Sequence, residues 1–160
     1  MWNVYEFYGM FAEESSKEQG TSSKSDNVLD QWILARLFEL HRDVTAGMES
    51  YKLHEASRPI MDFILDLSQW YVRRSRDRFK GGDEADKQAA LATLQYVLAE
   101  LAKLMAPFTP FIAEQIWQGV NKGTSDKKQV TSVHLELWSE TAGVEDEVVL
   151  KDMQTVRDIV

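Results

Sequence analysis

The sequence has no cysteine among its 160 residues. Disulfide bonds, thiolate metal sites and cysteine nucleophiles are therefore excluded, and a reducing intracellular setting is compatible with the composition. Long apolar runs are also missing, because no stretch approaches the roughly 20 residues that a membrane helix needs. The N-terminus lacks the basic start and the small-residue exit of a signal peptide. We therefore expect a soluble, cytoplasmic protein that makes no membrane contact.

Positive charge is scarce: 26 acidic residues outnumber 18 basic ones, and the formal net charge is -8. Proteins that bind nucleic acid without discrimination carry clustered positive charge, which releases counterions on binding. Any nucleic-acid contact of this chain must therefore be local. The length and the 44% hydrophobic content suffice for one domain with a single core.

Motifs for catalysis and for metal or phosphate binding are missing as well. His41, His54 and His134 lie far apart and form neither H-x-x-x-H nor H-E-x-x-H. The phosphate-binding patterns G-x-x-x-x-G-K-S/T and G-x-G-x-x-G do not occur. Ser68 and Ser75 have no neighbouring side chain placed along the sequence to act as a base. We expect no catalytic residue, no metal and no cofactor in this chain.

Apolar residues recur at helical spacing along most of the sequence. The pattern predicts a short helix over residues 2–12, then longer helices that begin near Asn27, after Lys52 and after Asp83. Asn27 or its neighbour Asp26, and also Asp83, can cap helix starts. Pro107 ends the last of these helices, and Pro110 suits the first position of the next one.

These elements predict an all-α protein, with an antiparallel helix bundle over residues 1–121 and a short irregular C-terminal appendage over residues 122–160. Residues 14–26 read as a flexible, serine-rich loop. The segment VHLELW suits an extended strand or a docked coil, and a further helix is expected from Glu145. The first helix opens without an N-cap, so we expect the chain to be part of something longer.

Four arginines fall within residues 73–78, directly after the pair Trp70 and Tyr71. On a continuous helix that advances 100° per residue, Arg74 and Arg78 lie on the side of the buried stripe, while Arg73 and Arg76 point away. The stripe changes from apolar to cationic, which predicts a helix that protrudes from one pole of the bundle. Residues 66–80 hold five basic and two acidic side chains, whereas residues 136–152 hold one basic and six acidic ones.

Two interpretations of this segment remain open. In the first, Arg73 pairs with Asp77, arginines near the helix C-terminus interact with its dipole, and the remaining ones are solvated. In the second, the guanidinium groups bind phosphates and stack on unpaired bases. Trp70 is likewise either a core residue or a contact for a ligand.

Four segments of the chain carry a family resemblance. They are LDQWILARL at 29–37, DLSQWYVRRSRDRFKG at 66–81, ALATLQYVLAELAKLMAPFTPFIAEQIW at 90–117 and SVHLELW at 132–138. Together they resemble the anticodon-binding domain of isoleucyl-tRNA synthetases. LMAPFTPFIAEQIW also resembles the valyl, leucyl and methionyl enzymes, whereas WYVRRSRDRF is the block that favours isoleucine.

The resemblance implies a helical domain that binds the anticodon stem-loop of a tRNA and contacts other domains of the parent synthetase. The parent enzyme would ligate isoleucine to tRNA in protein biosynthesis, using ATP with magnesium. The residues that the resemblance places at the RNA are Arg74, Arg78 and Phe79, with Trp70, Arg73 and Arg76 behind them and Asn3 and Phe7 as weaker candidates.

The two ATP-handling signatures of the family, of the His-Ile-Gly-His and Lys-Met-Ser-Lys-Ser types, are absent from the chain. We therefore expect the chain by itself to be catalytically inactive. Two alternatives stay open: a helical protein-interaction module whose arginine-rich pole binds an acidic partner, and the equivalent domain of a valyl-, leucyl- or methionyl-tRNA synthetase.

Overall fold

A computed structural model of the chain describes residues 1–12, 25–121 and 131–159. The described residues form helices and no β-strand, which confirms the predicted all-α class. The α-helices are α1 (Trp2–Ala12), α2 (Val28–Glu49), α3 (Leu53–Leu65), α4 (Arg76–Lys80), α5 (Glu84–Met105), α6 (Pro110–Val120) and α7 (Glu147–Ile159). Among them, none combines the length and the apolar character that a bilayer crossing requires. Most of the loop predicted for residues 14–26 lies outside the described residues.

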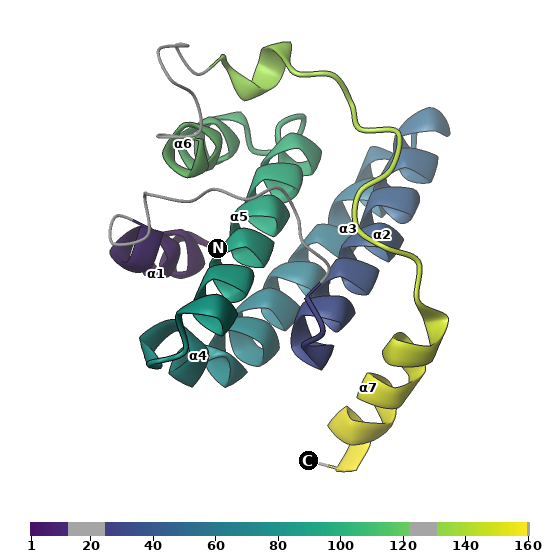
Figure 1. Ribbon diagram of the computed structural model, residues 1–160. Helices are drawn as coiled ribbons and strands as arrows, with labels where there is room; N and C mark the ends of the chain where they lie inside the picture. Colours follow the sequence, from purple (N-terminus) through teal and green to yellow (C-terminus); the bar gives the residue numbers. More distant parts are fainter. Residues whose placement is uncertain (13–24, 122–130, 160) are drawn as a thin grey trace.

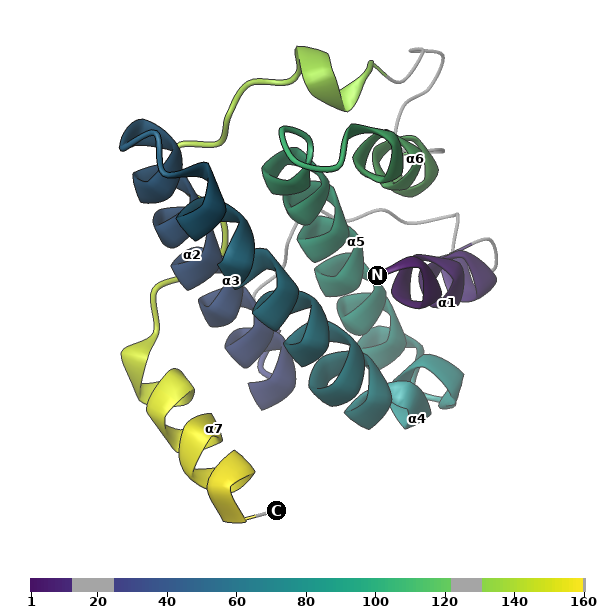
Figure 2. The ribbon, with the colours of Figure 1, turned by 180° about the vertical axis from the view of Figure 1, so that it is seen from behind.

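Three long helices, α2, α3 and α5, form the body of the bundle and lie side by side (Figures 1 and 2). The π-helical segment η1 (Asp66–Val72) continues α3 and leads into the short helix α4 at one end of the bundle. The helices α1 and α6 run across the long helices and pack against α5. The bundle is thus less regular than a simple up-and-down arrangement, because two of its helices cross the others.

Two of the predicted helix caps are present. The Asn27 side chain accepts a hydrogen bond from the backbone N–H of Leu29 at 2.9 Å. The Asp83 side chain accepts from the N–H groups of Ala85 and Asp86 at 3.0 and 3.3 Å. These side chains satisfy backbone donors that have no partner within their own helix. The predicted starts of α2 and α5 are therefore confirmed together with their physical cause.

The core lies where α2, α3 with η1, and α5 face one another. Its largest fully buried side chains are Trp32, Ile33, Leu37, Phe63, Leu67, Tyr71, Phe79, Leu94, Leu98, Leu101, Leu104 and Ile116. Each fully buried large apolar side chain stabilises the fold by about 1.5–3 kcal/mol relative to an exposed one. The first helix adds Val4, Phe7 and Tyr8 to this core, so the bundle depends on α1 as well as on the long helices.

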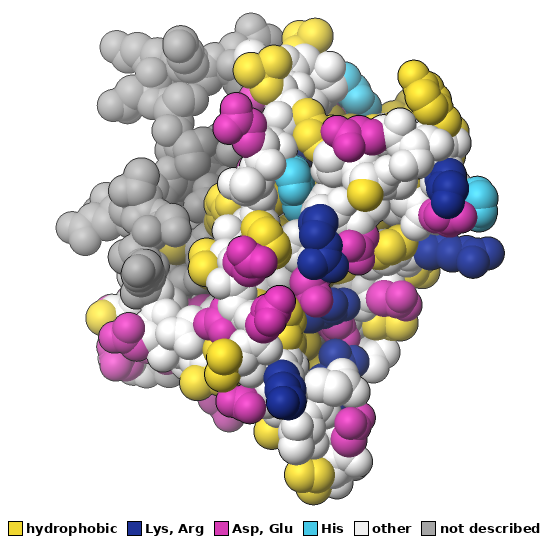
Figure 3. Space-filling model, turned by 90° about the vertical axis from the view of Figure 1, so that its right-hand side faces the viewer, with side chains coloured by type: hydrophobic (Ala, Val, Ile, Leu, Met, Phe, Trp, Pro, Cys, Tyr) yellow, Lys and Arg dark blue, Asp and Glu magenta, His cyan; other side chains and the backbone are white. Residues whose placement is uncertain are grey.

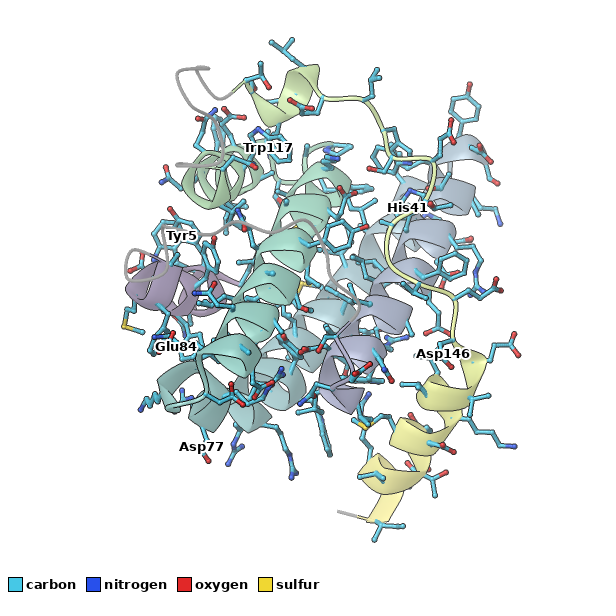
Figure 4. All side chains as sticks on the ribbon, viewed as in Figure 1. Tyr5, His41, Asp77, Glu84, Trp117 and Asp146 are labelled. Atoms are coloured by element: carbon cyan, nitrogen blue, oxygen red, sulfur yellow. The ribbon has the colours of Figure 1, made fainter. Side chains whose placement is uncertain are left out.

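The chain beyond residue 130 packs back onto the bundle as a strap (residues 131–146) that crosses α2 before α7 begins (Figure 1). The strap opens with the 3₁₀ turn η2 (Val133–Leu135) and continues as a docked coil, one of the two forms expected for VHLELW. His41 of α2, labelled in Figure 4, donates from Nε2 to the carbonyl oxygen of Ser139 at 2.7 Å. The Ser139 hydroxyl donates to Glu100 at 2.6 Å. Hydrogen bonds to two helices therefore hold the strap in place.

Gly47 of α2 lies directly against Ala56 of α3. A Cβ atom at this position would lie 2.8 Å from the Cβ and 2.9 Å from the Cα of Ala56. We expect Gly47→Ala to destabilise the fold by about 1–3 kcal/mol, because the two helices must separate. The matched control is Gly9→Ala in α1, where a Cβ meets nothing within 4 Å; it should stabilise by about 0.5–1 kcal/mol through helix propensity. Urea unfolding followed by circular dichroism measures both, and equal effects of the two changes would contradict the close packing.

Candidate nucleic-acid interface

The helix predicted to begin after Lys52 is interrupted rather than continuous. Seven residues, Asp66–Val72, are π-helical, and Ser75 leaves the helical geometry at φ -89° and ψ 1° before α4 begins. Wider π turns and a break of this kind change the phase of the side chains that follow. The prediction that Arg74 and Arg78 lie on the same side of one helix is therefore wrong: Arg74 is exposed, while the Arg78 side chain is only 12% exposed.

Arg78 closes a buried ionic cluster between α4, α2 and α5. Its two terminal nitrogens donate to the two carboxylate oxygens of Asp30 at 2.8 and 2.9 Å. Its Nε and Nη2 donate to Asp86 at 2.9 and 2.6 Å. The Tyr71 hydroxyl also donates to Asp30, at 2.8 Å. Because Asp30 is fully buried, the guanidinium is needed inside the bundle and is not available to a ligand.

The protonation states of this cluster follow from its geometry. Burial lowers the pKa of the Arg78 guanidinium, but its hydrogen bonds to Asp30 and Asp86 outweigh burial and raise that pKa overall. The hydrogen bond from Arg78 lowers the pKa of Asp86. Burial, followed by the charge of Asp30, raises the pKa of the Tyr71 hydroxyl well above its usual value. Tyr71 therefore stays neutral and donates a hydrogen bond to Asp30, while Arg78 and Asp86 remain charged.

Phe79 lies in the core rather than at the surface. Its side chain is fully buried, and its ring meets the Phe7 ring edge to face, with the centroids 5.1 Å apart. The Phe11 ring lies 6.0 Å away on the same helix as Phe7. The expectation that Arg78, Phe79 and Phe7 are presented to RNA is therefore wrong. The physical reason is that α1 covers Phe79 and that Asp30 requires the charge of Arg78.

The other arginines of the segment are exposed at the surface and form no ion pair among the described residues. Arg73, Arg74 and Arg76 are exposed, and Lys80 joins them at the end of α4. The expected ion pair between Arg73 and Asp77 is not among those formed by the described residues, and Asp77 points outward at this end of the bundle (Figure 4). Among the exposed side chains of residues 70–80, these four are basic and only Asp77 is acidic. We call Arg73, Arg74, Arg76 and Lys80, together with the neighbouring Trp70, the arginine pole.

Trp70 combines the two roles that the sequence left open. It is partly buried and packs against the core. The guanidinium carbon of Arg74 lies 4.7 Å from the centroid of its indole ring, and that of Arg157 in α7 lies 5.3 Å away. Arginine above an indole face is a favourable cation–π arrangement. The core therefore fixes Trp70 in position at the edge of the exposed arginines.

Asp66 anchors Arg157 and with it the helix α7. The Asp66 side chain is 6% exposed and forms ion pairs with Arg157 Nη2 at 2.8 Å and with Arg36 Nε at 3.0 Å. The two guanidinium groups come from α7 and α2, so one buried carboxylate joins three helices. Within the described ranges, no three His, Asp or Glu side chains converge as a metal ion would require.

Asp30, Asp66 and Arg157 are not among the residues that the sequence predicted for the site. A signal for the first two was present, because Asp30 lies three residues before the core residue Ile33 and Asp66 lies three residues after Phe63. An acid on a buried helical stripe indicates a buried partner, since an isolated carboxylate is costly to remove from water. No comparable signal pointed to Arg157, which lies on a mostly exposed helix.

The family of the chain follows from comparison with known proteins. The family described as "Anticodon-binding domain of tRNA ligase" matches residues 30–160. The chain belongs to this family. The matched range covers the residues of both ionic clusters and the helix α7 of this chain, and it extends beyond the predicted domain boundary at residue 121. That boundary stays a prediction.

Individual relatives of this anticodon-binding domain are similar over most of the chain. The isoleucine–tRNA ligase of Clostridium novyi is 41% identical over 143 residues, which are 88% of this chain and 14% of the relative. That of Thermus thermophilus is 38% identical over 165 residues, covering 100% of this chain and 16% of the relative. That of Streptomyces avermitilis is 39% identical over 167 residues, covering 99% and 15%. The chain thus spans about one-sixth of the length of these relatives or slightly less.

Removal of Arg78 tests its structural role. We expect Arg78→Met to destabilise the domain by about 3–5 kcal/mol, because it leaves the buried carboxylate of Asp30 without a counter-charge. Arg76→Met, the same change at an exposed neighbour, should stay within about 0.5 kcal/mol of the parent. Urea denaturation measures both.

A double variant provides the control for this prediction. Asp30→Asn combined with Arg78→Met should recover part of the lost stability, because neither buried charge remains. If Arg78→Met were as mild as Arg76→Met, the buried cluster would not be the constraint that we describe.

Proposed function

We propose that this chain binds the anticodon stem-loop of a tRNA through the arginine pole. The observation that carries the proposal is the set of exposed arginines, Arg73, Arg74 and Arg76, beside Trp70 in a chain whose net charge is -8. Asp30 and Asp86 pair with Arg78, and Asp66 pairs with Arg157, whereas these three exposed arginines form no ion pair with a described residue. Membership of the anticodon-binding domain family supports the same ligand.

The chemistry of the arginine pole suits single-stranded RNA. Guanidinium groups bind phosphates through paired N–H donors and also stack on the faces of unpaired bases. An indole ring adds a second stacking surface, and a stacked base contributes about 1–3 kcal/mol to such complexes. Trp70 and Arg74 lie close enough to form one continuous surface of this kind. Bases splayed from a loop would therefore stack here while Arg73 and Arg76 hold the backbone.

We further propose that the full protein is an isoleucine–tRNA ligase that uses ATP with magnesium in the cytoplasm. The relatives carry that name, and the block WYVRRSRDRF at residues 70–79 favours isoleucine over valine, leucine or methionine. Catalysis would lie in other domains, with which this domain would make contacts. The arginine pole would then contribute binding and orientation of the tRNA rather than a chemical step.

A double substitution tests the arginine pole. We expect Arg74→Ala with Arg76→Ala to weaken binding of the anticodon stem-loop, and the slope of log affinity against log salt to fall by about 1 for each phosphate contact removed. The control with an equal charge change is Arg42→Ala with Arg58→Ala, two exposed arginines of α2 and α3. Fluorescence anisotropy with labelled RNA between 50 and 200 mM salt measures both.

The outcome also separates the competing function. An equal loss of affinity in both double variants would indicate unspecific attraction and would contradict a defined interface. If the unmodified chain binds no stem-loop at low salt but captures acidic peptides through Arg74 and Arg76, it is a protein-interaction module. In the full-length ligase, unchanged aminoacylation after the Arg74 and Arg76 changes would refute the role of the arginine pole.

A further inference from the structure

A cleft of about 460 Å³ lies between α7 and the pair formed by α2 and α3 with η1. Binding sites for small organic groups have volumes of about 300–1,000 Å³. The buried residues Trp32 and Asp66 form the floor of the cleft. Leu65 and Leu150, which are more exposed, form its apolar sides, and the exposed residues Asp62 and Gln154 form its rim. The cleft is therefore large enough for a heterocyclic base and offers it both apolar and polar walls.

The charges of the cleft exclude a phosphate as its occupant. Two guanidinium groups, from Arg36 and Arg157, face three carboxylates, from Glu39, Asp62 and Asp66. Both arginines are already paired with Asp66, and Arg36 also pairs with Glu39. Figure 3, which faces this side of the molecule, shows basic and acidic side chains interspersed rather than a patch of one sign. A neutral, flat group with polar edges fits this environment better than an anion.

The cleft is continuous with the arginine pole through Arg157. The Arg157 side chain lines the cleft, and its guanidinium carbon also lies 5.3 Å from the centroid of the Trp70 ring. The Trp70 ring in turn contacts the guanidinium group of the exposed Arg74. The helices α4 and α7 end at the same end of the bundle (Figures 1 and 2). An RNA strand on the arginine pole would therefore have this cleft next to it.

We propose that the cleft receives one unpaired nucleobase of the bound RNA. Leu65, Leu150 and the Arg157 guanidinium would cover the faces of the base. The Asp62 carboxylate, for which the described residues provide no hydrogen-bond or ion-pair partner, would accept from an N–H group on the edge of the base. The inference rests on the proposed function, because it assumes an RNA on the arginine pole, and it adds a site on α7 that the sequence did not indicate.

Filling the cleft tests the proposal. Gln154→Trp places an indole in the cleft from α7, and Thr155→Trp places the same side chain on the exposed surface of that helix. We expect Gln154→Trp to weaken stem-loop binding by about 5- to 150-fold, the range for one lost stacked base. Thr155→Trp should leave the affinity within about twofold. Melting curves confirm that both variants fold.

A second variant keeps the test independent of changes in α7. Asp62→Trp fills the cleft from α3, and its neighbour Met61→Trp, which does not line the cleft, is the matched control. If Gln154→Trp prevents folding, this pair replaces it in the binding experiment. A loss of affinity in Asp62→Trp that is absent in Met61→Trp supports the cleft in the same way.

Abasic RNA identifies what enters the cleft. An abasic residue at one loop position should weaken binding to the wild-type chain as much as Gln154→Trp does, and should cost the filled variant little more. Losses that simply add at every loop position would overturn the proposal. So would a free nucleoside, tested as adenosine, guanosine, cytidine and uridine, that binds the cleft without changing RNA affinity.

Failure of this inference is distinguishable from failure of the proposed function. If both filled variants bind RNA like the wild type while Arg74→Ala with Arg76→Ala weakens binding, the cleft proposal is wrong and the arginine pole stands. If the wild-type chain binds no stem-loop at 50 mM salt, both proposals are wrong.

Discussion

The pair formed by Arg78 and the buried Asp30 is the constraint on which the rest of the site depends. Its two residues lie 48 positions apart, and their contact joins the end of α4 to the start of α2. Asp86 adds α5 to the same point. A buried carboxylate must be balanced, so the chain has to bring a guanidinium to this place. Once α4 is fixed in this way, Arg73, Arg74 and Arg76 remain outside the bundle, where they can meet a ligand.

A second buried acid, Asp66, does the same for the C-terminal helix. It holds Arg36 of α2 and Arg157 of α7, and Met153 is the one buried residue of α7 among those described. Val149 and Leu150 add partly buried apolar contacts to the core, so α7 is held by apolar packing together with the ion pair of Arg157. Because Arg157 also lies over Trp70, the position of α7 and the edge of the arginine pole are coupled through one side chain.

Neutralisation inside the bundle also explains how an acidic protein can have a local cationic surface. Asp30 and Asp86 pair with Arg78, and Asp66 pairs with Arg36 and Arg157, whereas the basic residues of the arginine pole have no ion-pair partner among the described residues. The acidic strap runs along the other side of the bundle from α4 (Figures 1 and 2). Salt screens charges beyond about 8 Å at physiological ionic strength. An RNA docked on the arginine pole would therefore respond to the nearby arginines more than to the net charge.

The sequence by itself determined the all-α class and the starts of α2 and α5 with their caps at Asn27 and Asp83, because helical periodicity and capping involve residues close together in the chain. It also located the arginine segment. Only the tertiary structure decided which of those arginines are free. The π-helical segment changes the side-chain phase after Asp66, and the partners of Arg78 and Trp70, namely Asp30 and Arg157, come from distant parts of the chain. Contacts of that range depend on how the helices pack, which no local pattern specifies.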